Sequence, residues 1–154
     1  MKLKAALSLA LAGAALAVAP LRAIAVDSDP SPPVSNEHAA GKNAIKAKDW
    51  NGAIQSLTAA AQRDSRNADL HNLLGYAYRN AGQLDPAFKH YQRALQLDPR
   101  HLGAHEYIGE AYLVAGNLAK AEEHLATLKR ICQAVCEERD DLAWSIERYR
   151  AGKK

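Results

Sequence analysis

Small and hydrophobic residues recur along the chain at a fixed interval of 34 positions. The small residues repeat as Gly41, Gly75 and Gly109 and as Ala53, Ala87 and Ala121, and the larger ones as Leu57, Tyr91 and Leu125. A period of this length indicates supersecondary units that stack on one another. The pattern predicts three such units at 34–67, 68–101 and 102–135.

The middle unit predicts how each repeat is built. Gly82 stands where a first helix should end in a left-handed conformation, which suits a residue without a Cβ. Asp85 and Pro86 then predict a second helix, with Asp85 as its N-cap and Pro86 in its first turn. The two helices are expected to approach each other most closely at Gly75 and Ala87, where the side chains must be small. One unit is therefore predicted to be helix, tight turn and helix.

The middle unit resembles the tetratricopeptide repeat signature. The residues that match are Leu74, Gly75, Tyr78, Ala87, Tyr91, Ala94 and Pro99. The resemblance implies an all-α fold, a right-handed α-solenoid of three helix-turn-helix units within a domain at 37–150. Residues 136–150 continue the register for half a unit, which implies a C-terminal capping helix. The family resemblance also implies that the protein is a binding scaffold and not an enzyme.

In this family the first helices of successive repeats line a concave groove that receives a partner segment. The resemblance places in it His38, Lys42, Lys46, Asn72, Tyr76, Arg79, Asn80, Glu106, Glu110 and Leu113, with Val114 beside them. The wall is expected to change from basic in the first repeat to acidic in the third, which would orient a charged segment. Lys42 and Arg79 are expected to project into solvent. An ordinary solvated helix face is the alternative.

The first 25 residues have the layout of a secretory signal peptide. A short basic stretch precedes the charge-free run 5–19, and Ala23-Ile24-Ala25 supplies the small residues of a cleavage site. The run is shorter than the ~20 residues that span a bilayer, although an uncleaved anchor is the alternative. We expect a periplasmic or secreted protein that starts at Val26, with no stable membrane insertion after cleavage. Residues 26–36, rich in Pro and Ser, are expected to be a flexible lead-in.

The overall charge gives no reason to expect a nucleic-acid partner. The chain has 20 Lys and Arg against 17 Asp and Glu, but three of the basic residues lie in the predicted leader, which has no acidic residue. The remainder is therefore balanced, and neither nucleic acid nor an anionic membrane is favoured as a partner.

The two cysteines, Cys132 and Cys136, lie at the joint between the third repeat and the expected capping helix. An even number of cysteines in an oxidising compartment predicts a structural disulfide, which would hold this turn. The alternative is a metal or redox site, because soft thiolates suit Cu(I).

Four of the six histidines form two series with the repeat period, His71 with His105 and His90 with His124. Equivalent residues of stacked repeats lie about 10 Å apart, too far to share one metal ion. No arrangement typical of a catalytic or phosphate-binding site stands out. The sequence therefore predicts a non-catalytic interaction scaffold without a cofactor or metal, whose partner is a protein or peptide segment. A metal- or redox-handling protein that uses the two cysteines is the alternative.

Overall fold

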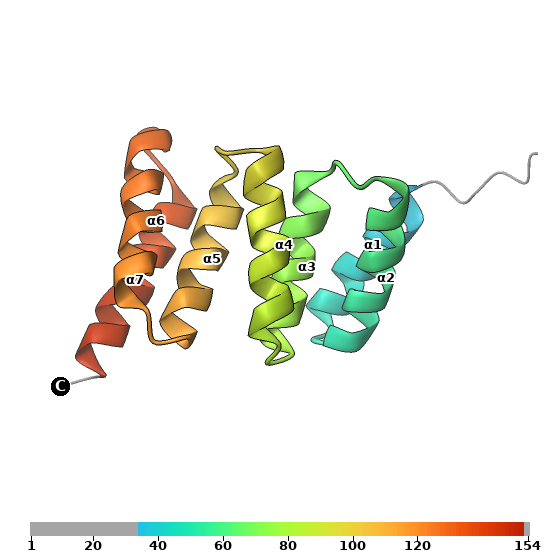
Figure 1. Ribbon diagram of the computed structural model, residues 1–154, viewed down its shortest axis with the longest axis horizontal. Coiled ribbons are helices and arrows are strands. Elements are labelled where there is room, and N and C mark those ends of the chain that lie inside the picture. The colour runs from blue at the N-terminus through green and yellow to red at the C-terminus, as the bar shows by residue number, and fades with distance from the viewer. Residues whose placement is uncertain (1–33, 153–154) are drawn as a thin grey trace, which may run out of the picture.

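The computed structural model describes residues 34–152, which form seven α-helices and no strand within that range. The helices are α1 (Val34–Lys46), α2 (Trp50–Arg63), α3 (Ala68–Asn80), α4 (Leu84–Leu97), α5 (Leu102–Val114), α6 (Leu118–Ile131) and α7 (Glu137–Ala151). They stand side by side in a row that runs from α1 and α2 at one end to α6 and α7 at the other (Figure 1). The predicted all-α repeat fold is confirmed. Within 34–152 no helix has the length and apolar character needed to cross a membrane.

The N-terminal predictions fall almost wholly outside this range. The predicted signal peptide 1–25 and most of the lead-in 26–36 lie outside the described residues. Helix α1 begins at Val34, so the prediction of a flexible lead-in was wrong for residues 34–36. Glu37 supports the helix there, because a carboxylate in the first turn interacts favourably with the helix dipole. Glu37 also pairs with Arg63 of α2 at 3.0 Å.

Tight turns at glycine end the first helices of the second and third repeats. Gly82 has a φ of 77°, and Gly116 repeats this conformation with a φ of 80°, as predicted for Gly82. The Gln83 N–H donates to the carbonyl oxygen of Tyr78 at 2.9 Å and closes the turn. Gln83 follows the turn directly and is the N-cap of α4. Its side chain makes no capping hydrogen bond. The prediction of Asp85 as N-cap was therefore wrong, and Asp85 lies in the first turn.

Each repeat glycine makes room for a large side chain of a neighbouring helix. A Cβ at Gly75 would lie 2.5 Å from the ring of Tyr91, and one at Gly41 would lie 2.5 Å from Leu57. These contacts join the two helices of one repeat. In the third repeat the residue over the glycine belongs to α7 instead, because a Cβ at Gly109 would lie 2.6 Å from Leu142. Helix α7 therefore packs into the last repeat as part of its core.

The odd-numbered helices form the inner face of the solenoid. Helix α1 contacts α3, α3 contacts α5 and α5 contacts α7, whereas within residues 34–152 the helices α2, α4 and α6 do not contact one another. A row of helix pairs that touch only along one layer curves toward that layer. The helices α1, α3, α5 and α7 therefore line the concave face, and α4 lies in front of α3 when the outer face is viewed (Figure 1).

Candidate partner-binding groove

The inner face is hollowed between α5 and α7. A pocket of about 370 Å³ is lined by Leu113, Val114, Trp144, Ser145, Arg148 and Tyr149. A second hollow of about 280 Å³ shares three of these residues and extends to Arg79 and Glu110. Two large apolar side chains are exposed to solvent here, Val114 at 66% and Trp144 at 58% of their surface. Exposed apolar side chains beside a concave surface are typical of a binding site.

A polar network joins three helices beneath this hollow. Arg79 of α3 forms an ion pair with one carboxylate oxygen of Glu110 on α5. The other carboxylate oxygen accepts a hydrogen bond from the Ser145 hydroxyl of α7 at 3.1 Å. The Arg79 side chain is only 12% exposed. The prediction that Arg79 projects into solvent was therefore wrong, because Glu110 holds its guanidinium group against the helices.

Aromatic rings flank the same guanidinium group. The Arg79 Cζ atom lies 5.3 Å from the ring centroid of Tyr76 and 5.6 Å from that of Tyr107. The two tyrosine rings are 4.9 Å apart, and Trp50 meets Tyr76 edge to face at 6.1 Å. Cation–π contacts and an ion pair together hold Arg79 in one position. The middle of the groove is therefore lined by aromatic rings that pack around Arg79.

The third repeat does not provide the acidic wall that was expected. Glu106 is only 8% exposed, and burial, followed by the charges of Glu110, Asp141 and Glu138, raises its pKa to about 8. A carboxyl group with this pKa is mostly neutral at pH 7. The charge of Glu110 is balanced by Arg79. The two carboxyl groups of α5 that were expected to form the acidic wall are therefore buried or paired, whereas Glu138 and Asp141 of α7 lie near this end of the groove.

The other predicted groove residues differ in their accessibility. Lys42 and Lys46 are exposed on α1, and His38 is half-buried. Asn80 is exposed, and its amide donates to the Tyr76 carbonyl of its own helix at 2.8 Å. Asn72 is buried between α3 and α5, and Leu113 is buried in the core that α5, α6 and α7 share. Among the predicted groove residues, the exposed charges thus lie at the α1 end.

The four pocket residues on α7, which are Trp144, Ser145, Arg148 and Tyr149, were not among the predicted groove residues. Trp144 and Arg148 lie one helical turn apart on α7, with the guanidinium group of Arg148 4.5 Å from the Trp144 ring. Both stand 68 positions after predicted groove residues, Trp144 after Tyr76 and Arg148 after Asn80. The repeat register was extended into the capping helix for its core positions, and applying the groove positions there as well would have found Trp144 and Arg148.

The histidines pair within repeats and not between them. His71 of α3 meets His90 of α4, with their Nδ1 atoms 3.1 Å apart, and His105 of α5 meets His124 of α6 at 2.9 Å. The members of each pair lie 19 positions apart in the sequence, a separation that the 34-residue period does not reveal. Burial, followed by the proximity of the partner ring, lowers the pKa of His90 and of His124 to about 4.

The cysteines flank the joint between the third repeat and the capping helix. Cys132 is the C-cap of α6 and Cys136 is the N-cap of α7. Their sulfur atoms lie at bonding distance and their Cα atoms 5.8 Å apart, within the range of disulfides. Elsewhere in the described range, no group of three or more His, Cys, Asp or Glu residues is arranged to hold a metal ion.

Comparison with known proteins identifies the repeats. Two family models described as tetratricopeptide repeat match residues 68–101 and 87–134. The first of these ranges contains α3 and α4. A search of curated protein sequences gave no match.

Solved structures share the fold. The tetratricopeptide repeat domain of Sgt2 from Aspergillus fumigatus has a TM-score of 0.69 at 19% identity, over 80% of this chain and 81% of that one. The type III secretion chaperone SycD of Yersinia enterocolitica, in complex with a peptide of the translocator YopD, has a TM-score of 0.70 at 18% identity, over 83% and 100% of the two chains. The TPR2B domain of yeast Sti1 in a complex with pHsp70 has a TM-score of 0.66 at 18% identity, over 75% and 96%.

The TM-scores show a common fold, and the family models add the repeat signature itself. Both agree with the interval of 34 residues and with the paired helices of the structure. Residues 68–134 are therefore identified as tetratricopeptide repeats, and the described chain as a whole has the fold of tetratricopeptide repeat domains.

Proposed function

We propose that this protein is a non-catalytic scaffold that binds an extended segment of a partner protein along α1, α3, α5 and α7. The pocket between α5 and α7, with its exposed Val114 and Trp144, is the observation that carries the proposal. Two structures of the same fold, SycD with a YopD peptide and Sti1 TPR2B with pHsp70, are complexes with a bound partner. They support a peptide-binding role.

The charges and the pocket suggest what the segment contains. Lys42 and Lys46 stand exposed at the α1 end and would favour acidic residues. The middle of the groove is close to neutral because Arg79 and Glu110 balance each other. At the α7 end, Trp144 and Val114 would receive an apolar side chain. We therefore propose a segment with acidic residues at one end and an apolar anchor at the other.

The test starts from a partner isolated with the wild-type protein from a native extract, followed by affinity measurements on variants. Trp144→Ala is expected to weaken binding by about tenfold or more, because buried tryptophans dominate interface energies. Lys42→Glu combined with Lys46→Glu should slow association, more strongly at low salt. Arg79 is left unchanged, since its replacement would leave Glu110 unpaired.

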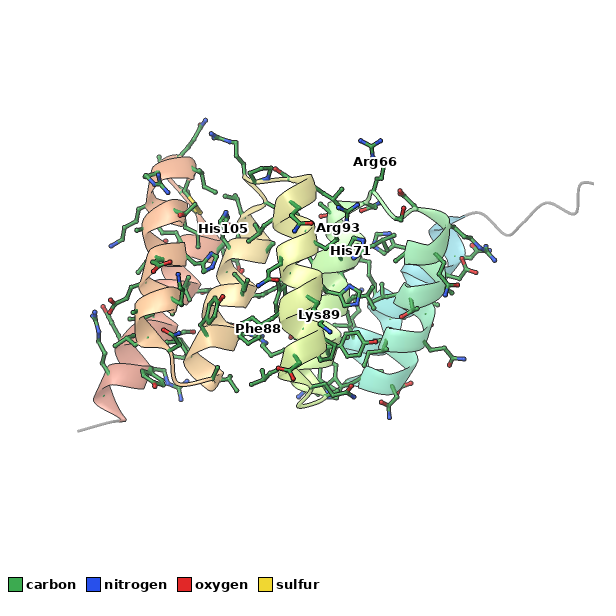
Figure 2. The ribbon with its side chains drawn as sticks, in the orientation of Figure 1. Arg66, His71, Phe88, Lys89, Arg93 and His105 are labelled. Carbon is green, nitrogen blue, oxygen red and sulfur yellow. A yellow bond between two sulfur atoms is a disulfide. The ribbon has the colours of Figure 1, made fainter. Side chains whose placement is uncertain are left out.

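Arg93→Glu is the matched control for this experiment. Arg93 is exposed on α4, in the outer layer, and Figure 2 shows its position. It should bind the partner as the wild type does. Loss of binding in this variant, with normal binding by the groove variants, would place the working surface on the outer face and overturn the proposal.

We also propose that the protein is exported, that residues 1–25 are removed and that Cys132 and Cys136 form a disulfide. The charge-free run and the small residues before Val26 support export, and the closeness of the sulfur atoms supports the disulfide. Intact mass should show a chain that begins at Val26, with no free thiol before reduction. A retained Met1 would contradict export, and two free thiols would favour the alternative of a metal- or redox-handling protein.

A further inference from the structure

Glu106 of α5 carries a buried carboxyl group without a partner. The residue is only 8% exposed, and its carboxyl group forms no hydrogen bond or ion pair with any residue of the described range. Its oxygen atoms are not completely enclosed, so a group from solvent can reach them. Burial of an unpartnered polar group costs free energy of folding, so stability does not explain its presence.

Three further acidic side chains surround this carboxyl group. Glu110 lies one turn along α5, and Glu138 and Asp141 come from α7, which packs against α5. Glu110 is paired with Arg79. Neither Glu138 nor Asp141 forms an ion pair with another residue of the described range. This part of the groove therefore has negative charge that no nearby cation balances.

These acidic side chains lie next to the apolar pocket between α5 and α7. Glu110 and Ser145 line one of its hollows, and Glu106 and Asp141 stand four positions before them on the same two helices. Residues four apart lie on one face of a helix, separated by about 6 Å along its axis. This distance equals about two residues of an extended chain. A partner side chain at Glu106 would thus stand about two residues from one in the pocket.

The chemistry of this cluster selects an organic cation. Ionised carboxyl groups only accept hydrogen bonds, and they attract positive charge. Within residues 34–152 no three acidic, His or Cys side chains are grouped closely enough to hold a metal ion. A guanidinium or ammonium group offers several N–H donors on a long side chain and can reach acceptors that are spread more widely.

We propose that Glu106, Glu138 and Asp141 form an acidic subsite that binds an arginine or lysine side chain of the partner segment. The subsite belongs to the groove of the proposed function, on which this inference rests. It adds a basic residue, about two positions from the apolar anchor, to the segment expected there. Opposite charges at an interface favour the correct partner and the correct register.

Binding at the acidic subsite should release a proton. Burial, followed by the acidic neighbours, raises the pKa of Glu106 to about 8, so the group is mostly protonated at pH 7. A bound cation favours the ionised form, and the proton leaves to solvent. Affinity should therefore rise between pH 6 and pH 8. The groups that face Glu106 are Arg79 from α3, Tyr107 and Glu110 from α5, and Glu138 and Asp141 from α7.

The test is a selection from a library of random peptides of about ten residues with blocked termini, bound to the mature protein at pH 7. The wild type should enrich an apolar residue with Arg or Lys about two positions away. Glu106→Gln combined with Asp141→Asn should keep the apolar preference and lose the basic one. In a selected peptide, citrulline, the neutral analogue of arginine, should weaken binding by about tenfold or more. Circular dichroism checks the fold of the variant.

Glu147→Gln is the matched control, because Glu147 is exposed on α7 and lines a different hollow, between α6 and α7. It should select the same peptides as the wild type. Apolar enrichment without basic enrichment would overturn the acidic subsite and leave the proposed function in place. Basic enrichment that persists in the double variant would also overturn it. A library from which nothing is enriched would contradict the proposed function as well.

A second measurement follows the affinity of a selected arginine peptide with pH. Arginine stays charged throughout, so a rise between pH 6 and pH 8 would come from the protein. The rise should be present in the wild type and absent in Glu106→Gln. Equal pH dependence of the two proteins would show that Glu106 does not contact the cation.

Discussion

At the scale of single residues, the repeat glycines show how little space separates paired helices. A Cβ at Gly75 would overlap the ring of Tyr91, which is fully buried. Gly75→Leu is therefore expected to lower the free energy of unfolding by ~1–3 kcal/mol or more, through overpacking. Urea unfolding at equilibrium measures the change.

Ala119→Leu serves as the matched control, because Ala119 is exposed on α6. The same side chain added there should change the free energy of unfolding by about 0.5 kcal/mol or less. Equal stability of the two variants would mean that Gly75 does not lie at a close helix contact.

The neutral carboxyl group of Glu106 predicts a pH dependence. Its pKa rises from 4.5 to about 8 in the folded protein, mainly through burial. The charges of Glu110, Asp141 and Glu138 also raise it, and the charge of Arg79 opposes them. Between these values the folded state keeps a proton that the unfolded state has lost. The contribution of Glu106 to stability is therefore largest below pH 4.5 and falls as the pH rises to about 8.

Glu106→Gln removes this contribution while keeping a neutral side chain of similar shape. Urea unfolding at several pH values should show a stability advantage of the variant that grows between pH 5 and pH 8. If the stabilities of the two proteins run parallel over this range, Glu106 is ionised in the folded state.

At the scale of elements, α7 has one face packed in the core and one face beside the pocket. Leu142 is fully buried against Gly109, whereas Trp144 is 58% exposed beside the pocket. Leu142→Ala should lower the free energy of unfolding by about 2–5 kcal/mol, the usual range for a buried leucine. Trp144→Ala should lower it far less and act mainly on partner binding. Thermal melting and partner affinity, measured on both variants, separate the two roles.

The short loop at the joint before α7 determines how much the proposed disulfide is expected to stabilise the fold. A bond between Cys132 and Cys136 closes a loop of only five residues, for which chain entropy gives about 2 kcal/mol of stabilisation. The double variant Cys132→Ser, Cys136→Ser should melt at a lower temperature than the oxidised wild type. A reductant should not change the melting temperature of the variant. An oxidised wild type that melts as the double variant does would show that the bond adds nothing.

At the scale of the whole molecule, the contacts among α1, α3, α5 and α7 set the curvature and thereby the inner face. The exposed lysines lie at one end of this face and the pocket lies at the other. A partner segment that used both would have to be extended along the row of helices. Because such a segment would span the row of helices, its binding surface would be a groove and not an isolated pocket.

Much of this architecture could be predicted from the sequence. The 34-residue period identified the repeat fold, because each unit must present the same small and apolar residues to its neighbours to bury a continuous core. The resemblance to tetratricopeptide repeats assigned residues to the inner face, including Tyr76 and Glu110. These predictions depend on positions that repeat, and periodicity reveals such positions directly.

The tertiary structure alone decided which side chains meet. Arg79 pairs with Glu110 across 31 residues, Ser145 reaches Glu110 across 35, and His71 meets His90 across 19. None of these separations is the repeat period, because a contact between helices joins different positions of a unit. The ion pairing of Glu110 follows from these contacts, and the raised pKa of Glu106 follows mainly from burial. Charge pairing and protonation therefore depend on distances in the folded chain that the order of residues does not contain.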